Sequence, residues 1–221
     1  MAHAFLLPSW FFGFGIGLEL LFAIITLGLA IFAYRIYKVT DQSQVKLFGI
    51  SFFLISISYF LQSIFNFLIV SKANENICTA LKINSIALFN YYGFYAHIIF
   101  MISGLVVLLY MTFKIKRERI FWLLLVTSLL VVYMGRDPFN VFYLLASIYL
   151  IFISWHFIEN YLKNRRKKKT LLIAVAFIFL LVGRIHFNFV TNHELFYVVG
   201  HVLELFAYLF ILLNFYLVKK K

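Results

Sequence analysis

The chain has 221 residues, of which 64% are hydrophobic and 13% charged, and its formal net charge is +12. A water-soluble core of this size cannot bury so much apolar surface, so the composition excludes a soluble globular protein and indicates an integral membrane protein. The basic run KNRRKKK at 163–169 has no interleaved aromatic residues on which bases could stack, so we do not expect nucleic-acid binding.

Seven segments are apolar over roughly the 20 residues that a helix needs to cross the hydrocarbon. In chain order they cover about 11–36, 45–70, 86–112, 119–134, 138–162, 171–190 and 195–218, and the fourth is the shortest. None alternates apolar and polar residues as a barrel strand does. The loops are too short for a soluble domain. The sequence therefore predicts a single all-α domain over 1–221, a seven-transmembrane-helix bundle.

The distribution of lysine and arginine predicts the orientation. If the N-terminus lies outside, the outer side keeps only Lys72, Lys82, Arg136 and Arg184, and the other basic residues fall inside. The positive-inside rule favours this arrangement, with the C-terminus in the cytoplasm. We expect a multi-pass protein of the cell membrane whose cytoplasmic face contacts anionic headgroups.

Polar residues interrupt the first three segments at similar depths. Glu19, in the segment 11–36, lies roughly 12 Å below the outer boundary at 1.5 Å per residue. It shares a helical stripe with the small residues Gly15 and Ala23. Gln62 and Asn66 reach a comparable level in 45–70. In 86–112, His97 lies on a stripe whose other members are Asn90, Gly93, Met101 and Gly104.

The later segments add a second group of polar residues. Asp137 followed by Pro138 is typical of the N-cap and first turn of a helix, here that of 138–162. Arg184 lies in 171–190. The segment 195–218 places Tyr197, His201, Glu204 and Tyr208 on one stripe. Ionisable residues at membrane depth are costly, so each is a candidate for function.

These side chains fall at one depth in the outer half, and we expect them to share a buried His/Glu site. Two imidazoles and two carboxylates suit a divalent transition metal, zinc or iron, with Glu19, His97, His201 and Glu204 as ligands or their orienting partners. Haem b is the second cofactor considered. His97 and His201 would then be axial ligands, and Arg184 would meet a propionate.

Other functions use the same pocket. A receptor or transporter would take a small ligand or a proton from the outer side, through ionisable relays. A packing-only account is also open, in which Arg184 pairs with Glu204 or with Glu19 and His97 bonds to a backbone carbonyl. A covalent retinal pigment is excluded because 195–218 contains no lysine for the Schiff base.

A membrane metal-dependent hydrolase remains a further alternative, so enzymatic activity is left open. The seven-span layout with the N-terminus outside, and with His97 and His201 in the third and last spans, loosely resembles the alkaline ceramidases, which are seven-helix zinc hydrolases. The resemblance covers topology. Where that family's last helix carries His-x-x-x-His, this chain has His201 followed by Glu204, so the zinc triad is not reproduced.

Overall fold

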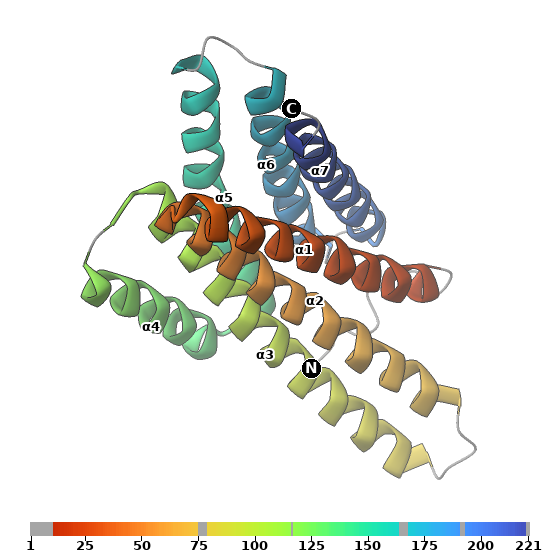
Figure 1. The fold of residues 1–221 in the computed structure, drawn as a ribbon. Coiled ribbons are helices and arrows are strands. Elements are labelled where there is room, and N and C mark those ends of the chain that lie inside the picture. Colours follow the sequence, from red (N-terminus) through yellow and green to blue (C-terminus); the bar gives the residue numbers. More distant parts are fainter. Residues whose placement is uncertain (1–10, 75–78, 116, 164–167, 191–192, 220–221) are drawn as a thin grey trace.

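The computed structural model describes residues 11–74, 79–115, 117–163, 168–190 and 193–219. These ranges form seven helices and contain no strand, which confirms the predicted all-α class (Figure 1). The helices are α1 (Phe12–Thr40), α2 (Ser43–Asn74), α3 (Thr79–Thr112), α4 (Glu118–Met134), α5 (Pro138–Lys163), α6 (Lys168–Phe187) and α7 (Leu195–Lys219).

Six of these helices, all but α4, are long and apolar enough to cross a membrane. The protein is therefore a multi-pass, membrane-type helical protein. The helix α4 has 17 residues and is about 26 Å long at 1.5 Å per residue. A hydrocarbon core is about 30 Å thick, so α4 is slightly short for a perpendicular crossing.

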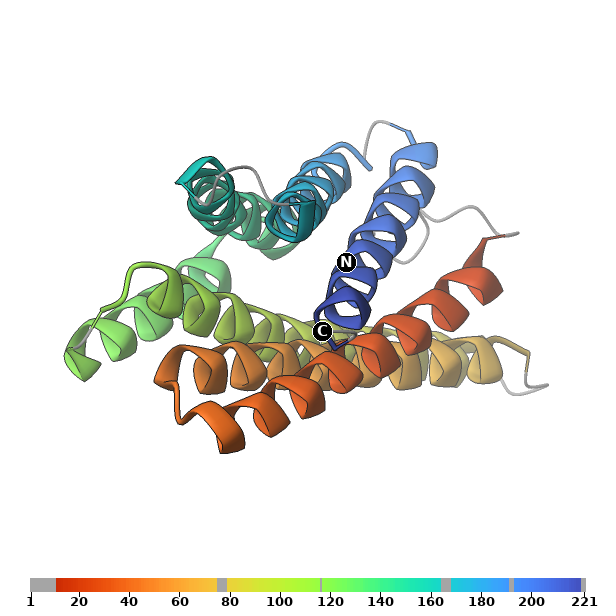
Figure 2. The same cartoon turned by 45° about the horizontal axis from the view of Figure 1, so that its top comes forward.

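The helices form two layers. The helices α1, α2 and α3 lie side by side in one layer, and α5, α6 and α7 form the other (Figure 2). Contacts between α3 and α5 and between α1 and α7 join the layers. The helix α4 packs beside α3 and α5 at the edge, where Ser128 and Val132 are its buried residues. The core therefore lies between two three-helix layers.

Two helices extend beyond their predicted membrane segments. The spans predicted at 45–70 and 86–112 continue as helix to Asn74 and back to Thr79, respectively. The intervening sequence 71–85 contains neither glycine nor proline, so nothing local ends the helices where the apolar run stops. The length of the apolar run therefore predicts the apolar part of each helix and underestimates the length of the whole helix. Residues 164–167 of the basic run lie outside the described part of the chain.

Small residues on α3 allow α2 to approach closely. A Cβ at Gly93 would lie 2.5 Å from Cβ of Phe65, and one at Gly104 would lie 2.9 Å from the backbone oxygen of Ser51. The predicted inward stripe of α3 is confirmed at Gly93, His97, Met101 and Gly104, all buried. Close contact through glycine is how membrane helices associate in the absence of a hydrophobic driving force between them.

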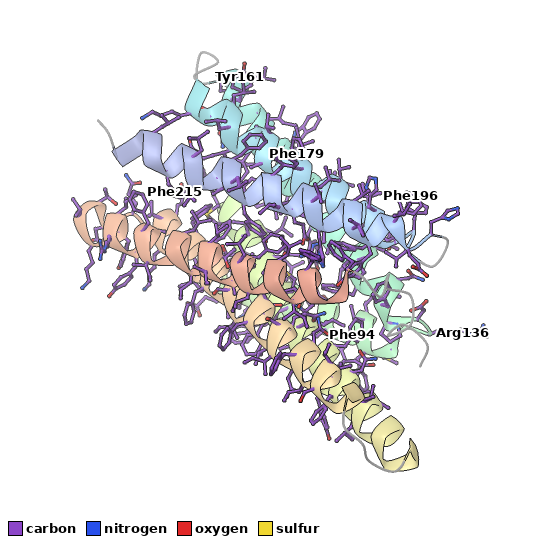
Figure 3. The ribbon with its side chains drawn as sticks, turned by 90° about the vertical axis from the view of Figure 1, so that its right-hand side faces the viewer. Phe94, Arg136, Tyr161, Phe179, Phe196 and Phe215 are labelled. Atoms are coloured by element: carbon purple, nitrogen blue, oxygen red, sulfur yellow. The ribbon has the colours of Figure 1, made fainter. Side chains whose placement is uncertain are left out.

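Aromatic side chains cover much of the surface as well as the interior (Figure 3). Phe215 on α7 packs edge-on against Phe32 on α1, with 4.9 Å between ring centroids, and helps to join the layers. At the start of α5, the Asp137 carboxylate accepts hydrogen bonds from the backbone N–H and the side chain of Asn140. This confirms the predicted capping role of Asp137.

Candidate functional site

The predicted polar site residues are buried together in one cavity. The exposed fractions of Glu19, His97, Arg184, His201 and Glu204 are all between 0% and 5%. The cavity lies between the two layers, and every helix except α4 contributes to its lining: Glu19, Tyr59, Gln62, His97, Tyr143, Arg184, Tyr197, His201 and Glu204. Polar side chains from the first, third and last predicted segments thus line one cavity.

The cavity is small. The centre of a water molecule has about 10 Å³ in which to move within it, which is about the minimum that holds one water. Pockets for drug-sized organic ligands are about 300–1,000 Å³. In this conformation the cavity therefore has room for one water molecule or a single small ion.

Arg184 and Glu204 form the buried ion pair of the site. Nη2 of Arg184 lies 2.9 Å from Oε1 of Glu204. The same nitrogen donates a 2.8 Å hydrogen bond to the Tyr59 hydroxyl, which in turn accepts a 3.1 Å hydrogen bond from Tyr208. The guanidinium carbon lies 5.7 Å from the ring centroid of Tyr143, so aromatic faces also surround the cation.

Glu19 has a different partner. The side-chain amide nitrogen of Asn66, on α2, lies 2.9 Å from both carboxyl oxygens of Glu19. The packing-only account is therefore only partly sufficient. The ion pair with Arg184 neutralises the charge of Glu204, but Glu19 is held by a neutral amide and has no such counter-charge in that pair. A buried carboxyl beside a neutral donor retains its need for a positive charge or a proton.

The two histidines differ in their surroundings. Nδ1 of His97 lies 2.8 Å from the Ser58 hydroxyl, which also donates to the His97 backbone carbonyl, so this ring is fixed between α2 and α3. Nδ1 of His201 lies 3.6 Å from Oε2 of Glu204, beyond ordinary hydrogen-bond length. Among the described residues, neither ring nitrogen of His201 has a hydrogen-bond partner. His201 is thus the imidazole with free bonding capacity in the site.

The donor groups do not form a metal centre as they stand. Within the described ranges, no three His, Cys, Asp or Glu side chains lie close enough together to hold a metal ion. Glu19, His97, His201 and Glu204 line one cavity, yet the first two are bonded to Asn66 and Ser58 on α2. Coordination by all four would require some of these side chains to change partners.

Glycines set the distance between the two helices that carry the ion pair. A Cβ at Gly183, on α6, would lie 3.1 Å from the backbone oxygen of Gly200 on α7 and 3.4 Å from Cγ of Glu204. On the other helix, a Cβ at Gly200 would lie 2.8 Å from the Phe187 ring. The close approach of α6 and α7 therefore holds Arg184 within bonding distance of Glu204.

Arg184 also lines a second hollow. Its lining is almost entirely apolar and consists of Phe52, Ile55, Met101, Leu105, Leu108, Leu150, Phe177, Leu180, Arg184 and Tyr208. The centre of a water molecule has about 20 Å³ in which to move there. Arg184 therefore lines both a polar cavity and an apolar one.

Two tyrosines of the site, Tyr59 and Tyr143, were not foreseen as functional residues, whereas Tyr197 was expected on the stripe that carries His201 and Glu204. The sequence offers 43 phenylalanine and tyrosine side chains together, and packing or interfacial roles were the natural assignment for most of them. The sequence does contain a sign that Tyr59 belongs to the site. Tyr59 shares a helical face with the polar residues Gln62 and Asn66, because positions 59, 62 and 66 follow helical spacing. Tyr143 carries a similar signal, because Asn140 and Ser147 lie three and four residues away on the same helical face.

No protein-family model, curated protein or solved structure matches this chain. The function proposed below therefore depends on the residues of the site alone.

Proposed function

We propose that this multi-pass membrane protein binds and releases a proton at the buried cavity, as part of a transport or sensing cycle. The supporting observation is the imbalance of charge. Among the described residues that line the cavity there are two carboxyl groups, Glu19 and Glu204, and one guanidinium, that of Arg184. The guanidinium is paired with Glu204, so a positive charge or a proton is needed at Glu19.

The energetic argument follows from burial. Even the lenient insertion scales assign an unpaired charge at the centre of a membrane helix a cost of about 3 kcal/mol. A proton on Glu19 removes that cost, and Asn66 continues to hold the carboxyl group. His201, with no bonded partner among the described residues, is positioned as the second group on which a proton can reside.

The size of the cavity supports a proton over a larger ligand. A space for one water molecule leaves no room for haem b or an organic solute in this conformation. A bound water would connect Glu19 to His201, because both line the same space. In this proposal, any transported solute binds in a different conformation of the protein, in which the cavity is larger.

The proposal includes seven membrane crossings with the N-terminus outside. The helix α4 then crosses as the short seventh span, and its exposed apolar residues face lipid: Trp122, Leu123, Val126, Leu130, Val131, Tyr133 and Met134. The basic segments between α1 and α2, α3 and α4, and α5 and α6 support this orientation. The cavity then lies in the half of the membrane that faces the cell exterior.

Glu19→Gln tests the proton directly. Glutamine reproduces a neutral carboxylic acid in shape and keeps a partner for Asn66, so we expect the free energy of unfolding to change by less than about 0.5 kcal/mol. In liposomes loaded with a pH-sensitive dye, we expect proton uptake by the native protein and none by the variant. An infrared difference spectrum should show the loss of one protonated carboxyl band.

Glu194→Gln is the matched control, because Glu194 is exposed just before α7 and carries the same carboxyl group. It should retain both the proton uptake and the infrared band. Equal loss of proton uptake and of the infrared band in both variants would contradict a protonated Glu19. So would a Glu19→Gln protein that is as unstable as a variant without the Arg184–Glu204 ion pair.

A metal ion is the second candidate, and His201 is the observation that favours it. Its two ring nitrogens have no hydrogen-bond partners among the described residues, and Oε2 of Glu204 lies 3.6 Å from Nδ1, within ion-pair distance. Zinc or iron bound here would take imidazole nitrogen and carboxylate oxygen as ligands, with Glu19 and His97 reached after local rearrangement.

Metal content separates the two candidates. If the metal account holds, protein purified without chelator contains about one zinc or iron per chain by elemental analysis, and His201→Ala contains none. His193→Ala is the matched control, since His193 is exposed outside the cavity. The proton proposal predicts no stoichiometric metal in any of the three proteins.

A further inference from the structure

A groove between α1 and α2 lies close to the turn that connects them and far along both helices from the polar cavity. The groove is open to the surroundings, and the centre of a water molecule has about 320 Å³ in which to move within it. The lining residues come from the second half of α1 and the first half of α2: Leu27, Ala30, Ile31, Tyr34, Lys46, Gly49, Ile50 and Phe53. The two helices lie side by side here and run in opposite directions (Figure 1).

Small residues produce the hollow. Ala30 and Gly49 are buried at the contact between the helices, where a Cβ at Gly49 would lie 3.3 Å from the backbone oxygen of Ala30. Larger side chains rise on either side, among them Ile31 at 49% exposure and Phe53 at 48%. The result is a furrow with a floor of small residues and walls of exposed apolar side chains.

The groove has an apolar length and a charged end. Leu27 and Tyr34 are seven residues apart on α1, and Lys46 and Phe53 are seven apart on α2, so the groove runs about 10 Å along the helices. Lys46 is the one charged residue among the described residues that line it. Because the helices are antiparallel, Lys46 and Tyr34 lie at the end near the turn.

Further positive charge gathers at that end. Nζ of Lys38 lies 5.1 Å from the ring centroid of Tyr34, and Nζ of Lys46 lies 5.5 Å from that of Tyr37. Aromatic rings thus hold both ammonium groups beside the mouth of the groove. An apolar furrow that ends at two lysines complements a molecule with a hydrocarbon chain and an anionic head.

We propose that this groove is a specific site for an anionic phospholipid. One acyl chain lies between the walls formed by Ile31, Ile50 and Phe53, and the phosphate lies against Lys46 and Lys38. A second copy of the chain fits less well, because a symmetric pairing in the membrane would bring the same lysines of both copies together at one depth. The proposal is independent of what the polar cavity binds.

Native mass spectrometry of the whole protein tests this site. The protein is reconstituted into nanodiscs of equal parts phosphatidylglycerol and phosphatidylcholine. The lipids that remain bound to the protein after it is released from the nanodisc are then identified. We expect one retained phosphatidylglycerol per chain. Lys46→Gln should lower its occupancy about fivefold, which is the contribution of one lysine near an anionic surface.

Two matched controls distinguish specific lipid binding in the groove from general electrostatic attraction of anionic lipids to the protein surface. Lys114→Gln removes the same charge from an exposed position outside the groove and should retain the lipid. Ile50→Trp fills the groove and should expel the acyl chain, whereas Ile151→Trp, at a similarly exposed position on α5, should not.

Equal loss of lipid in Lys46→Gln and Lys114→Gln would overturn the proposal, as would equal retention of phosphatidylcholine and phosphatidylglycerol by the native protein. A dimer that dissociates on Ile50→Trp would assign the groove to a second copy instead.

Discussion

Glu204→Gln is expected to lower the free energy of unfolding by about 3–5 kcal/mol, since it removes one partner of a buried ion pair. The variant leaves the guanidinium of Arg184 buried at 4% exposure, with the Tyr59 hydroxyl as a neutral acceptor. The hydroxyl cannot replace the carboxylate charge that lies 2.9 Å away in the native protein. Unfolding in mild detergent, followed by circular dichroism, measures the loss.

The double variant Arg184→Met/Glu204→Met serves as the internal control. Replacement of both members of a buried pair by apolar residues is often neutral, so we expect the double variant to recover most of the stability that the single change removes. If the double variant is as unstable as Glu204→Gln, shape and packing at Glu204 matter more than the ion pair. If Glu204→Gln is as stable as the native protein, Arg184 has another counter-charge.

Gly104→Leu is expected to have the second large effect, of about 3 kcal/mol or more, by forcing α2 and α3 apart. A Cβ at this position would lie 2.9 Å from the Ser51 backbone oxygen and 2.7 Å from Cγ1 of Ile55. The backbone oxygen cannot rotate away as a side chain can, so the helices themselves must move. His97 and Ser58 bridge the same two helices and should be displaced with them.

Gly28→Leu is the control for this prediction. It introduces the same side chain into α1 at an exposed position where a Cβ meets no heavy atom of the described chain within 4 Å. It should unfold at or slightly above the native temperature, because leucine has the higher helix propensity. Similar losses in both variants would point to glycine-specific backbone effects instead of contact between α2 and α3.

The sequence was sufficient to predict the all-α class of the fold and the helical faces that turn inward. Apolar length identified the membrane helices, and helical spacing identified the inward stripes, as the burial of Glu19, His97 and Glu204 confirms. Both inferences depend on regularities of a single helix, its rise and its periodicity. Such regularities can be read from the chain without knowledge of which helices are neighbours.

Partners could not be predicted for the same reason. Arg184 was open to pairing with Glu204 or with Glu19, and the choice depends on the approach of α6 to α7 at Gly183 and Gly200. The size of the cavity was equally hidden, because it depends on how the aromatic side chains of several helices fill the space between the two layers. Donors predicted to lie at one depth suggested a metal or haem, whereas the observed cavity has room for one water molecule or a single small ion.

Arg184 lines both the polar and the apolar hollow, and the contrast between the two spaces has a consequence for proton leakage. Because Arg184 is paired with Glu204, the pair carries no net charge that would draw a proton beyond the polar cavity. Leucine and phenylalanine side chains line the apolar hollow and offer few groups to carry a proton onward. A proton can cross this apolar hollow only if the side chains that line it move and admit water.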